Sequence, residues 1–176
     1  MYITARGSDR KTQKLCKDIA QYCADILLGT RLSDKIELRI EFVKQLDKHN
    51  AIEGDCGWED DELRPREFTI RIREGLKLSR KLRTICHEMV HVKQYAKGEM
   101  KQMWKPARTT KFQGEYFSDD MDYWDTPWEI EAFGRECGLY TRWVDERKFT
   151  DHPVFDSRND PDVIEDCELE FLASKK

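Results

Sequence analysis

Long apolar runs are missing from this sequence. The longest strongly apolar stretch is Ile26-Leu27-Leu28, whereas a membrane-spanning helix needs about 20 such residues. The mean hydropathy of -0.82 also excludes an integral membrane protein. The amino terminus contains no apolar segment of the kind found in signal peptides, so no signal peptide is predicted.

An excess of positive charge is missing too. The chain has 31 Lys and Arg residues against 35 Asp and Glu residues, which gives a net charge of -4. This balance argues against a general nucleic-acid-binding protein, because binding to phosphates depends on an excess of cations. It leaves room for a local basic patch.

Cysteine pairs of the Cys-x-x-Cys type are absent. This argues against a zinc ribbon and against a thioredoxin-type redox site. Because nothing indicates export, we expect reduced and mostly buried thiols, and a cytoplasmic protein. The six widely spaced cysteines are Cys16, Cys23, Cys56, Cys86, Cys137 and Cys167.

The length of 176 residues predicts a single domain over 1–176, which is large enough to bury a hydrophobic core without disulfide bonds or a structural metal. The chain contains two kinds of segment. In one kind apolar residues recur at helical spacing, and in the other apolar and charged residues alternate. This order predicts an α+β fold with its core at about 36–145 and short helical extensions at both ends. The predicted helices are 11–28, 79–97, 126–144 and 159–171, and the predicted strands are 36–43, 68–72 and, more weakly, 50–58. The aromatic segment 101–125 is long for a loop, so we expect it to be functional or to carry short strands.

The predicted helix 79–97 contains the motif His-Glu-x-x-His, as His87-Glu88-Met89-Val90-His91. Four residues make just over one helical turn, so both imidazoles leave the same face at a separation that one metal ion can bridge. Glu88 lies beside them, where it can take a proton from a water at the metal. Only four histidines exist in the chain, and half of them fall in this motif.

A solvent-exposed helix face is the alternative interpretation of the motif. The helical projection puts His87 and His91 nearly opposite the apolar stripe of this helix, which excludes a pair of core histidines. A solvent face and a site face both remain. The apolar neighbours Cys86 and Val90 favour a helix that is buried on more than one side, and therefore a site.

The third metal ligand is predicted in Pro127-Trp128-Glu129-Ile130-Glu131-Ala132. Helical phase puts Glu129 on the apolar side of its helix and Glu131 on the wetter side, so Glu129 is favoured over Glu131. A competing interpretation makes Glu129 part of a capping box with Thr126. His49 and His152 are further candidates without a recognisable motif.

These motifs resemble those of the zincin metallopeptidases of the gluzincin type, in which two histidines and a glutamate bind zinc. The small single-domain members of bacteria and phages are the most similar, and the matching segments here are 68–72, 87–95, 104–124 and 127–132. The resemblance covers about 36–140. It implies a minimal zincin-like domain, in which a small twisted sheet packs on an active-site helix and a later ligand-bearing helix. It also implies one Zn2+ per chain and, for a phage protein, a location in the host cytoplasm.

One position departs from the family pattern. Larger gluzincins carry Asp or Asn after the small residue of the second motif, where this chain has Phe133. The bond that this group gives to a zinc histidine is then expected from Glu136 or from a backbone carbonyl.

The resemblance implies hydrolysis of a peptide bond by a zinc-activated water, with Glu88 as general base and then as proton donor to the leaving amine. A further donor usually stabilises the negative charge on the carbonyl oxygen. Tyr123, Tyr116, Arg135 and His152 are the candidates, and the sequence does not rank them. The family also implies that the strand before the active-site helix, Phe68–Arg73, is a sheet edge that pairs with an extended substrate.

Two weaker features have competing interpretations. The basic residues between Arg71 and Arg83 fit a DNA-facing patch, but a solvated strand and helix face is favoured. The tryptophans of 104–128 could form a wall of the substrate site or a hydrophobic core under a long loop, and both interpretations stay open.

A non-catalytic domain of this fold that binds a protein or DNA partner is the alternative to a peptidase, and the intact Glu88 favours the peptidase. We therefore expect a peptide or protein as the substrate, and we expect neither a membrane nor a nucleic acid as a partner.

Overall fold

The computed structural model describes residues 1–47, 49, 52–60, 63–103 and 108–149. The predicted helix 159–171 lies outside these residues, as do His152 and Trp104. None of the helices in the described ranges is long and apolar enough to cross a membrane.

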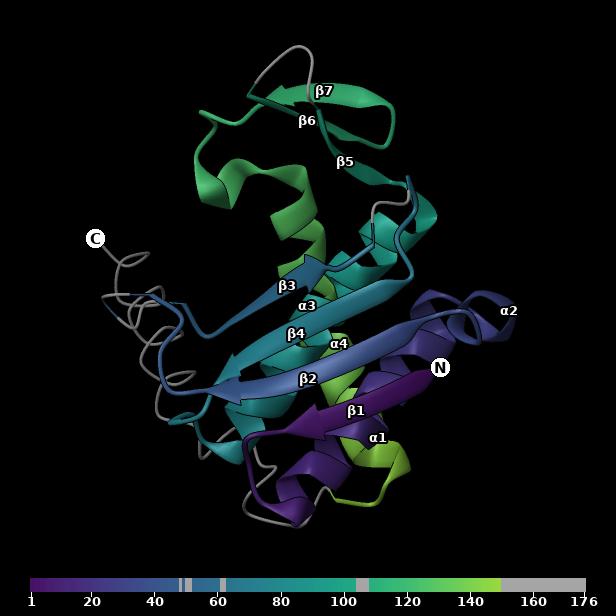
Figure 1. The fold of residues 1–176 in the computed structure, drawn as a ribbon, viewed down its shortest axis with the longest axis vertical. Coiled ribbons are helices and arrows are strands. Elements are labelled where there is room, and N and C mark those ends of the chain that lie inside the picture. The colour runs from purple at the N-terminus through teal and green to yellow at the C-terminus, as the bar shows by residue number, and fades with distance from the viewer. Residues whose placement is uncertain (48, 50–51, 61–62, 104–107, 150–176) are drawn as a thin grey trace, which may run out of the picture.

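The described chain is an α+β fold, as predicted, with two separate sheets. The helices are α1 Arg10–Leu27, α2 Thr30–Ser33, α3 Leu78–Lys97 and α4 Pro127–Glu146, with a short 3-10 helix η1 Tyr123–Asp125 before α4. The strands are β1 Tyr2–Arg6, β2 Glu37–Val43, β3 Gly54–Trp58, β4 Glu67–Arg73, β5 Met100–Met103, β6 Thr109–Phe112 and β7 Glu115–Ser118. All four strands of the larger sheet lie on one side of α1, α3 and α4 (Figure 1).

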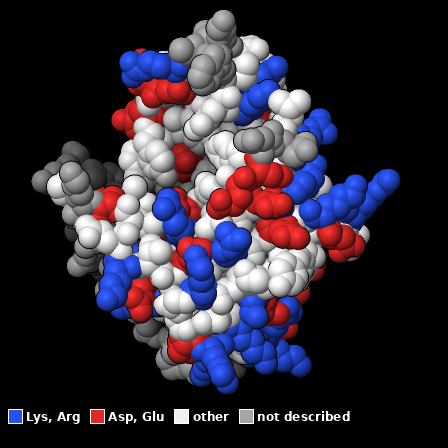
Figure 2. Space-filling view, in the orientation of Figure 1, with Lys and Arg blue, Asp and Glu red and all other residues white. Residues whose placement is uncertain are grey.

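The larger sheet has the strand order β1-β2-β4-β3. β1, β2 and β4 are parallel, and β3 runs antiparallel along β4 at the edge of the sheet. Ile40 of β2 lies opposite Ile70 of β4, and both are fully buried against the helices. The charged residues that alternate with them face the other side of the sheet. Figure 2 shows this open face covered with intermixed acidic and basic side chains, as expected for a solvated surface.

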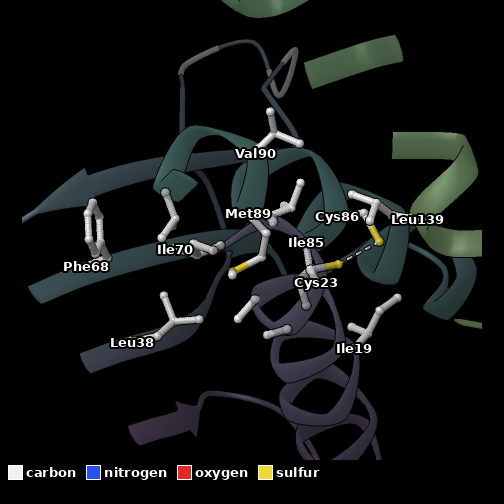
Figure 3. Packing of buried hydrophobic residues seen from close by; sticks show 14 of the residues in the cluster. Ile19, Cys23, Leu38, Phe68, Ile70, Ile85, Cys86, Met89, Val90 and Leu139 are labelled. Carbon is white, nitrogen blue, oxygen red and sulfur yellow. Dashed lines mark hydrogen bonds between the residues drawn. The ribbon is translucent and has the colours of Figure 1, made fainter. Parts of the chain in front are cut away.

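Strand β1 is not among the predicted elements. Its parallel pairing with β2 makes the amino-terminal segment part of the sheet, joined to β2 through α1. Helix α1 is likewise central to the hydrophobic core. Figure 3 shows Ile19 and Cys23 of α1 packed against Ile85 and Cys86 of α3, with the sulfurs of Cys23 and Cys86 3.7 Å apart.

The predicted aromatic segment forms the smaller sheet, with the order β5-β6-β7. Gln113 and Gly114 have φ values of 49° and 100° between β6 and β7, and this two-residue turn with positive φ is the favoured connection in a hairpin. Trp128 of α4 lies against Phe112 and Phe117 of this sheet, at ring distances of 6.1 and 6.2 Å. Trp128 therefore belongs to the core under the smaller sheet.

Candidate metal centre

Helix α3 carries His87, Glu88 and His91 in its centre, and all three are buried, with exposed fractions of 7%, 4% and 8%. The helix ends at Gly98, whose φ of 71° closes the last turn. The histidine face does lie away from the main apolar stripe, but it does not face solvent because α4 packs across it. The interpretation as a solvent-exposed face is therefore wrong.

Glu129 enters the same space from the first turn of α4. Its Oε2 lies 3.2 Å from Nε2 of His87, and its Oε1 lies 3.4 Å from Nε2 of His91. The two Nε2 atoms are themselves 3.2 Å apart. One donor atom from each of the three residues therefore lies within 4.8 Å of the others, and this buried group could hold a metal ion.

Among the described residues, the other candidates for the third ligand position, and the capping box, do not fit the structure. Glu131 points away from the histidine pair and is bound by Lys93 and Gln94. The capping box is not formed, since the side chain of Thr126 makes no cap to α4 and donates instead to the carbonyl of Tyr123. His49 lies on an exposed loop and is not part of the cluster.

The carboxylates around His87 and His91 favour positive charge in the cluster. Burial alone would raise the pKa of Glu129, but hydrogen bonds with His87 and His91 lower it far below its usual range. Burial would lower the pKa of His87, whereas its contacts with Glu129 and Glu136 raise it to about 9. The same balance raises the pKa of His91. Two imidazole nitrogens and one carboxylate directed at one point are a donor set that zinc accepts.

Glu88 lies next to the cluster but is not part of it. Burial raises the pKa of its carboxyl to about 7, although His91 and His87 act in the opposite direction. Its Oε1 lies close to the backbone of β3, because a Cβ atom at Gly54 would be only 3.1 Å away. Because residue 54 is a glycine, the space next to β3 is free for the Glu88 carboxylate.

A chain of hydrogen bonds holds the ring of His91. Its Nδ1 lies 2.8 Å from Oε1 of Gln94, and Nε2 of Gln94 donates to the carbonyl of Trp128 and to Glu131. Since the amide nitrogen already serves two acceptors, its oxygen faces the imidazole, and Nδ1 of His91 must be the donor. When His91 is neutral, its lone pair is therefore on Nε2, which faces Glu129 and the centre of the cluster. Lys93 donates to Glu131 at 2.7 Å and keeps that carboxylate in place.

Glu136, one of the two sources considered for a contact to a histidine of the motif, lies beside His87. Its Oε2 lies 3.3 Å from Nδ1 of His87, and its Oε1 lies 3.2 Å from a guanidinium nitrogen of Arg83. The Nδ1 contact is an ion-pair distance without full hydrogen-bond alignment. Position 136 is two helical turns beyond Glu129, which puts it on the same face of α4 as the ligand.

The cluster opens into a cleft of about 630 Å³ between α3, α4 and β3. Figure 2 shows the hollow above β3 with an acidic side chain at its base. Its lining combines a polar wall from β3 and α3 with an aromatic wall from η1 and α4. The residues that line it include Glu53, Gly54, Asp55, Cys56, Arg80, Thr84, Tyr95, Tyr123, Trp124, Phe133 and Glu136.

Of the three predicted oxyanion donors within the described residues, Tyr123, Tyr116 and Arg135, only Tyr123 lines the cleft. Its hydroxyl donates to Oε2 of Glu129 at 2.8 Å. Tyr116 lies on β7 under the ammonium group of Lys111, and Arg135 donates to Glu131, so neither reaches the cluster.

The predicted substrate edge Phe68–Arg73 is wrong. This segment is β4, which is paired on both sides, with β2 and with β3. The edge that lines the cleft is β3. The pattern of 50–58 was too weakly apolar to indicate that a strand would cover β4.

The basic residues between Arg71 and Arg83 are mostly paired with carboxylates. Arg71 binds Asp55, and Arg80 binds Glu53 at 2.5 Å. Arg83 binds Glu136 beside the cluster. These pairs fit the favoured interpretation of a solvated strand and helix face.

The fold and the cluster together define an α+β protein with a buried site that could hold a metal ion. Comparisons with protein-family models, with curated proteins and with solved structures found no match for the chain. A proposal for its function therefore rests on the geometry and chemistry of the site.

Proposed function

We propose that the protein is a zinc metallopeptidase that hydrolyses peptide bonds. The observation that carries this proposal is the convergence of His87, His91 and Glu129 beside a buried general base, Glu88, at the floor of an open cleft. A site with a purely structural metal is normally closed by four protein ligands, whereas three ligands and access to a cleft leave a position for water. When bound there, zinc supplies a Lewis acid that polarises a carbonyl and acidifies water.

Glu88 is the residue that moves protons in this proposal. Its carboxylate takes a proton from water as the water oxygen bonds to the carbonyl carbon. The proton then passes to the amine nitrogen as the carbon–nitrogen bond breaks, so the products are a carboxylic acid and an amine. A pKa of about 7 makes both the proton-accepting and the proton-donating form accessible near neutral pH.

The other side chains position these groups. Gln94 and Glu136 orient the two imidazole rings, and the hydroxyl of Tyr123 lies at the cleft side of Glu129, where it can turn towards a carbonyl oxygen. Tyr123 is therefore our preferred candidate for the additional donor.

Strand β3 offers a backbone edge for an extended peptide. The bonds from Arg73 N to Glu53 O and from Glu59 N to Glu67 O set which residues of β3 face β4. By alternation, the N–H and C=O groups of Gly54, Cys56 and Trp58 are directed away from β4. A peptide that pairs with them would lie along the cleft above Glu88.

The thiols support a reducing compartment. All five cysteines of the described residues are free, and Cys23 and Cys86 remain unbonded although their sulfurs are neighbours. We therefore propose a cytoplasmic location.

The first test is bound metal per chain, measured by elemental analysis on the wild type, Glu129→Ala and Glu131→Ala. We expect about one zinc in the wild type, loss of zinc in Glu129→Ala and retention in Glu131→Ala, which is the matched control from the same helix. Hydrolysis of a peptide library by the wild type but not by zinc-loaded Glu88→Gln then tests the reaction itself. A wild type without zinc at neutral pH would overturn the peptidase and favour a non-catalytic binding domain.

A further inference from the structure

Three aromatic rings form one wall of the cleft. Trp124 lies 5.1 Å from Phe133 and 5.3 Å from Tyr123, measured between ring centroids. Phe133 in turn contacts the ring of His87 at 4.5 Å. The wall therefore begins at a metal ligand and extends outward along η1 and the first turns of α4.

The described residues leave the outer part of this wall exposed. Trp124 is 67% exposed and Phe133 is 39% exposed, whereas Trp128, four residues further along from Trp124, is 9% exposed and packs under the smaller sheet. Large aromatic surfaces gain free energy when they are covered, and exposed groups of them mark binding sites.

The backbone that carries these rings is held in place before any ligand arrives. The carboxylate of Asp122 accepts a hydrogen bond from the backbone N–H of Trp124, and Thr126 donates to the carbonyl of Tyr123. Phe133 is fixed by the helical backbone of α4. An ordered apolar surface loses little entropy when it binds a side chain.

The opposite wall has a different chemistry. It includes the backbone of β3 and the carboxylates of Glu53 and Asp55, which are paired with Arg80 and Arg71. A ligand with a backbone to pair with β3 and an apolar side chain to cover the rings would satisfy both walls. An extended peptide with an aromatic residue has both features.

We propose that Trp124 and Phe133 form a subsite for an aromatic or large aliphatic side chain of an extended peptide. The subsite adjoins His87, so its occupant is a residue next to the bond presented to the metal cluster. The placement relative to a cleaved bond rests on the proposed function, whereas the preference for an aromatic side chain does not.

The test compares the binding of two peptides, acetyl-Ala-Ala-Phe-Ala-Ala-amide and the same peptide with Ala in place of Phe. Binding is measured by calorimetry on zinc-loaded Glu88→Gln, so that hydrolysis does not interfere. We expect the Phe peptide to bind about tenfold tighter. Trp124→Ala should abolish this difference, and Trp124→Phe should keep most of it.

Tyr116→Ala is the matched control, because Tyr116 is also exposed but lies on β7 and does not line the cleft. It should leave the preference unchanged. Equal affinities for the two peptides, or no measurable binding of the Phe peptide at millimolar concentration, would overturn the subsite. A preference that survives Trp124→Ala would do so as well.

The outcomes separate the subsite from the proposed function. Hydrolysis by the wild type without any preference for Phe overturns the subsite and leaves the peptidase intact. A Phe preference that depends on Trp124, in a wild type that hydrolyses neither peptide, supports the subsite and counts against the peptidase.

Discussion

Gly54 on β3 is the position where a single methyl group should disturb the site most. A Cβ atom there would lie 2.5 Å from Cγ2 of Thr84, 3.1 Å from Oε1 of Glu88 and 3.1 Å from Cδ1 of Ile72. The first contact is about 1 Å shorter than a carbon–carbon contact allows. Gly54→Ala must therefore push β3 away from α3 or force Thr84 and Glu88 out of their positions.

The expected net loss follows from two opposing effects. Overpacking of this kind costs about 1–3 kcal/mol. Replacing glycine by alanine in an extended strand returns about 0.5–1 kcal/mol, because the unfolded chain becomes less flexible. The two effects together give a loss of about 0–2.5 kcal/mol; because the contact with Thr84 is so short, we expect Gly54→Ala to lower the free energy of unfolding by about 1–2 kcal/mol, measured as a shift in the midpoint of urea unfolding.

Gly57 and Thr84 provide the controls. A Cβ atom at Gly57, on the same strand, meets nothing within 4 Å, so Gly57→Ala should be neutral or slightly stabilising. Thr84→Ser removes the Cγ2 atom and keeps the hydroxyl that donates to the carbonyl of Arg80. Combined with Gly54→Ala, it should recover about 1 kcal/mol relative to the sum of the single changes. A harmless Gly54→Ala, or a double variant whose losses simply add, would refute the close contact between β3 and α3.

Three further predictions concern the ion pairs and the metal. Asp18→Asn should lower the free energy of unfolding at neutral pH by about 1 kcal/mol or less, since the carboxylate is partly exposed. Burial raises the pKa of Asp18, but hydrogen bonds from Arg147 and Trp143 lower it below 3.8, so this difference should disappear in unfolding curves as the pH falls through that lowered pKa. Gln94→Leu should weaken zinc binding about 10–100-fold, measured against a chelating dye, because the ring of His91 loses its acceptor. Removal of zinc by a chelator should lower the unfolding temperature by about 10 °C in calorimetry, and an unchanged temperature would argue against binding at this site.

Local patterns allowed the prediction of two central strands and of the helices that carry the site. The alternation in 36–43 and 68–72 predicted β2 and β4 to within one residue at each end. The spacing of His87 and His91 and the helical phase of Glu129 depend only on the geometry of single helices. These features could be inferred because neighbours along the chain determine them.

The features that depend on distant contacts could not be predicted in this way. Strand β1 has only Ile3 and Ala5 as inward residues, and its partner β2 lies some thirty residues away. Whether the histidine face is buried depends on how α4 crosses α3, which no periodicity encodes. The contacts of Glu131 with Lys93 and Gln94 also depend on this crossing. By contrast, the contact between His91 and Gln94 could have been predicted, because their i, i+3 spacing brings the two side chains together on one helix.

The smaller sheet between α3 and α4 has a consequence for how such a protein can vary. Helices α3 and α4 pack directly on each other, and among the described residues between them Tyr123 also donates a hydrogen bond to Glu129 of the cluster. Insertion or grafting in this part of the chain is therefore a route to a new selectivity of the cleft, as long as Tyr123 and the rings of Phe112 and Phe117 that pack on Trp128 are retained.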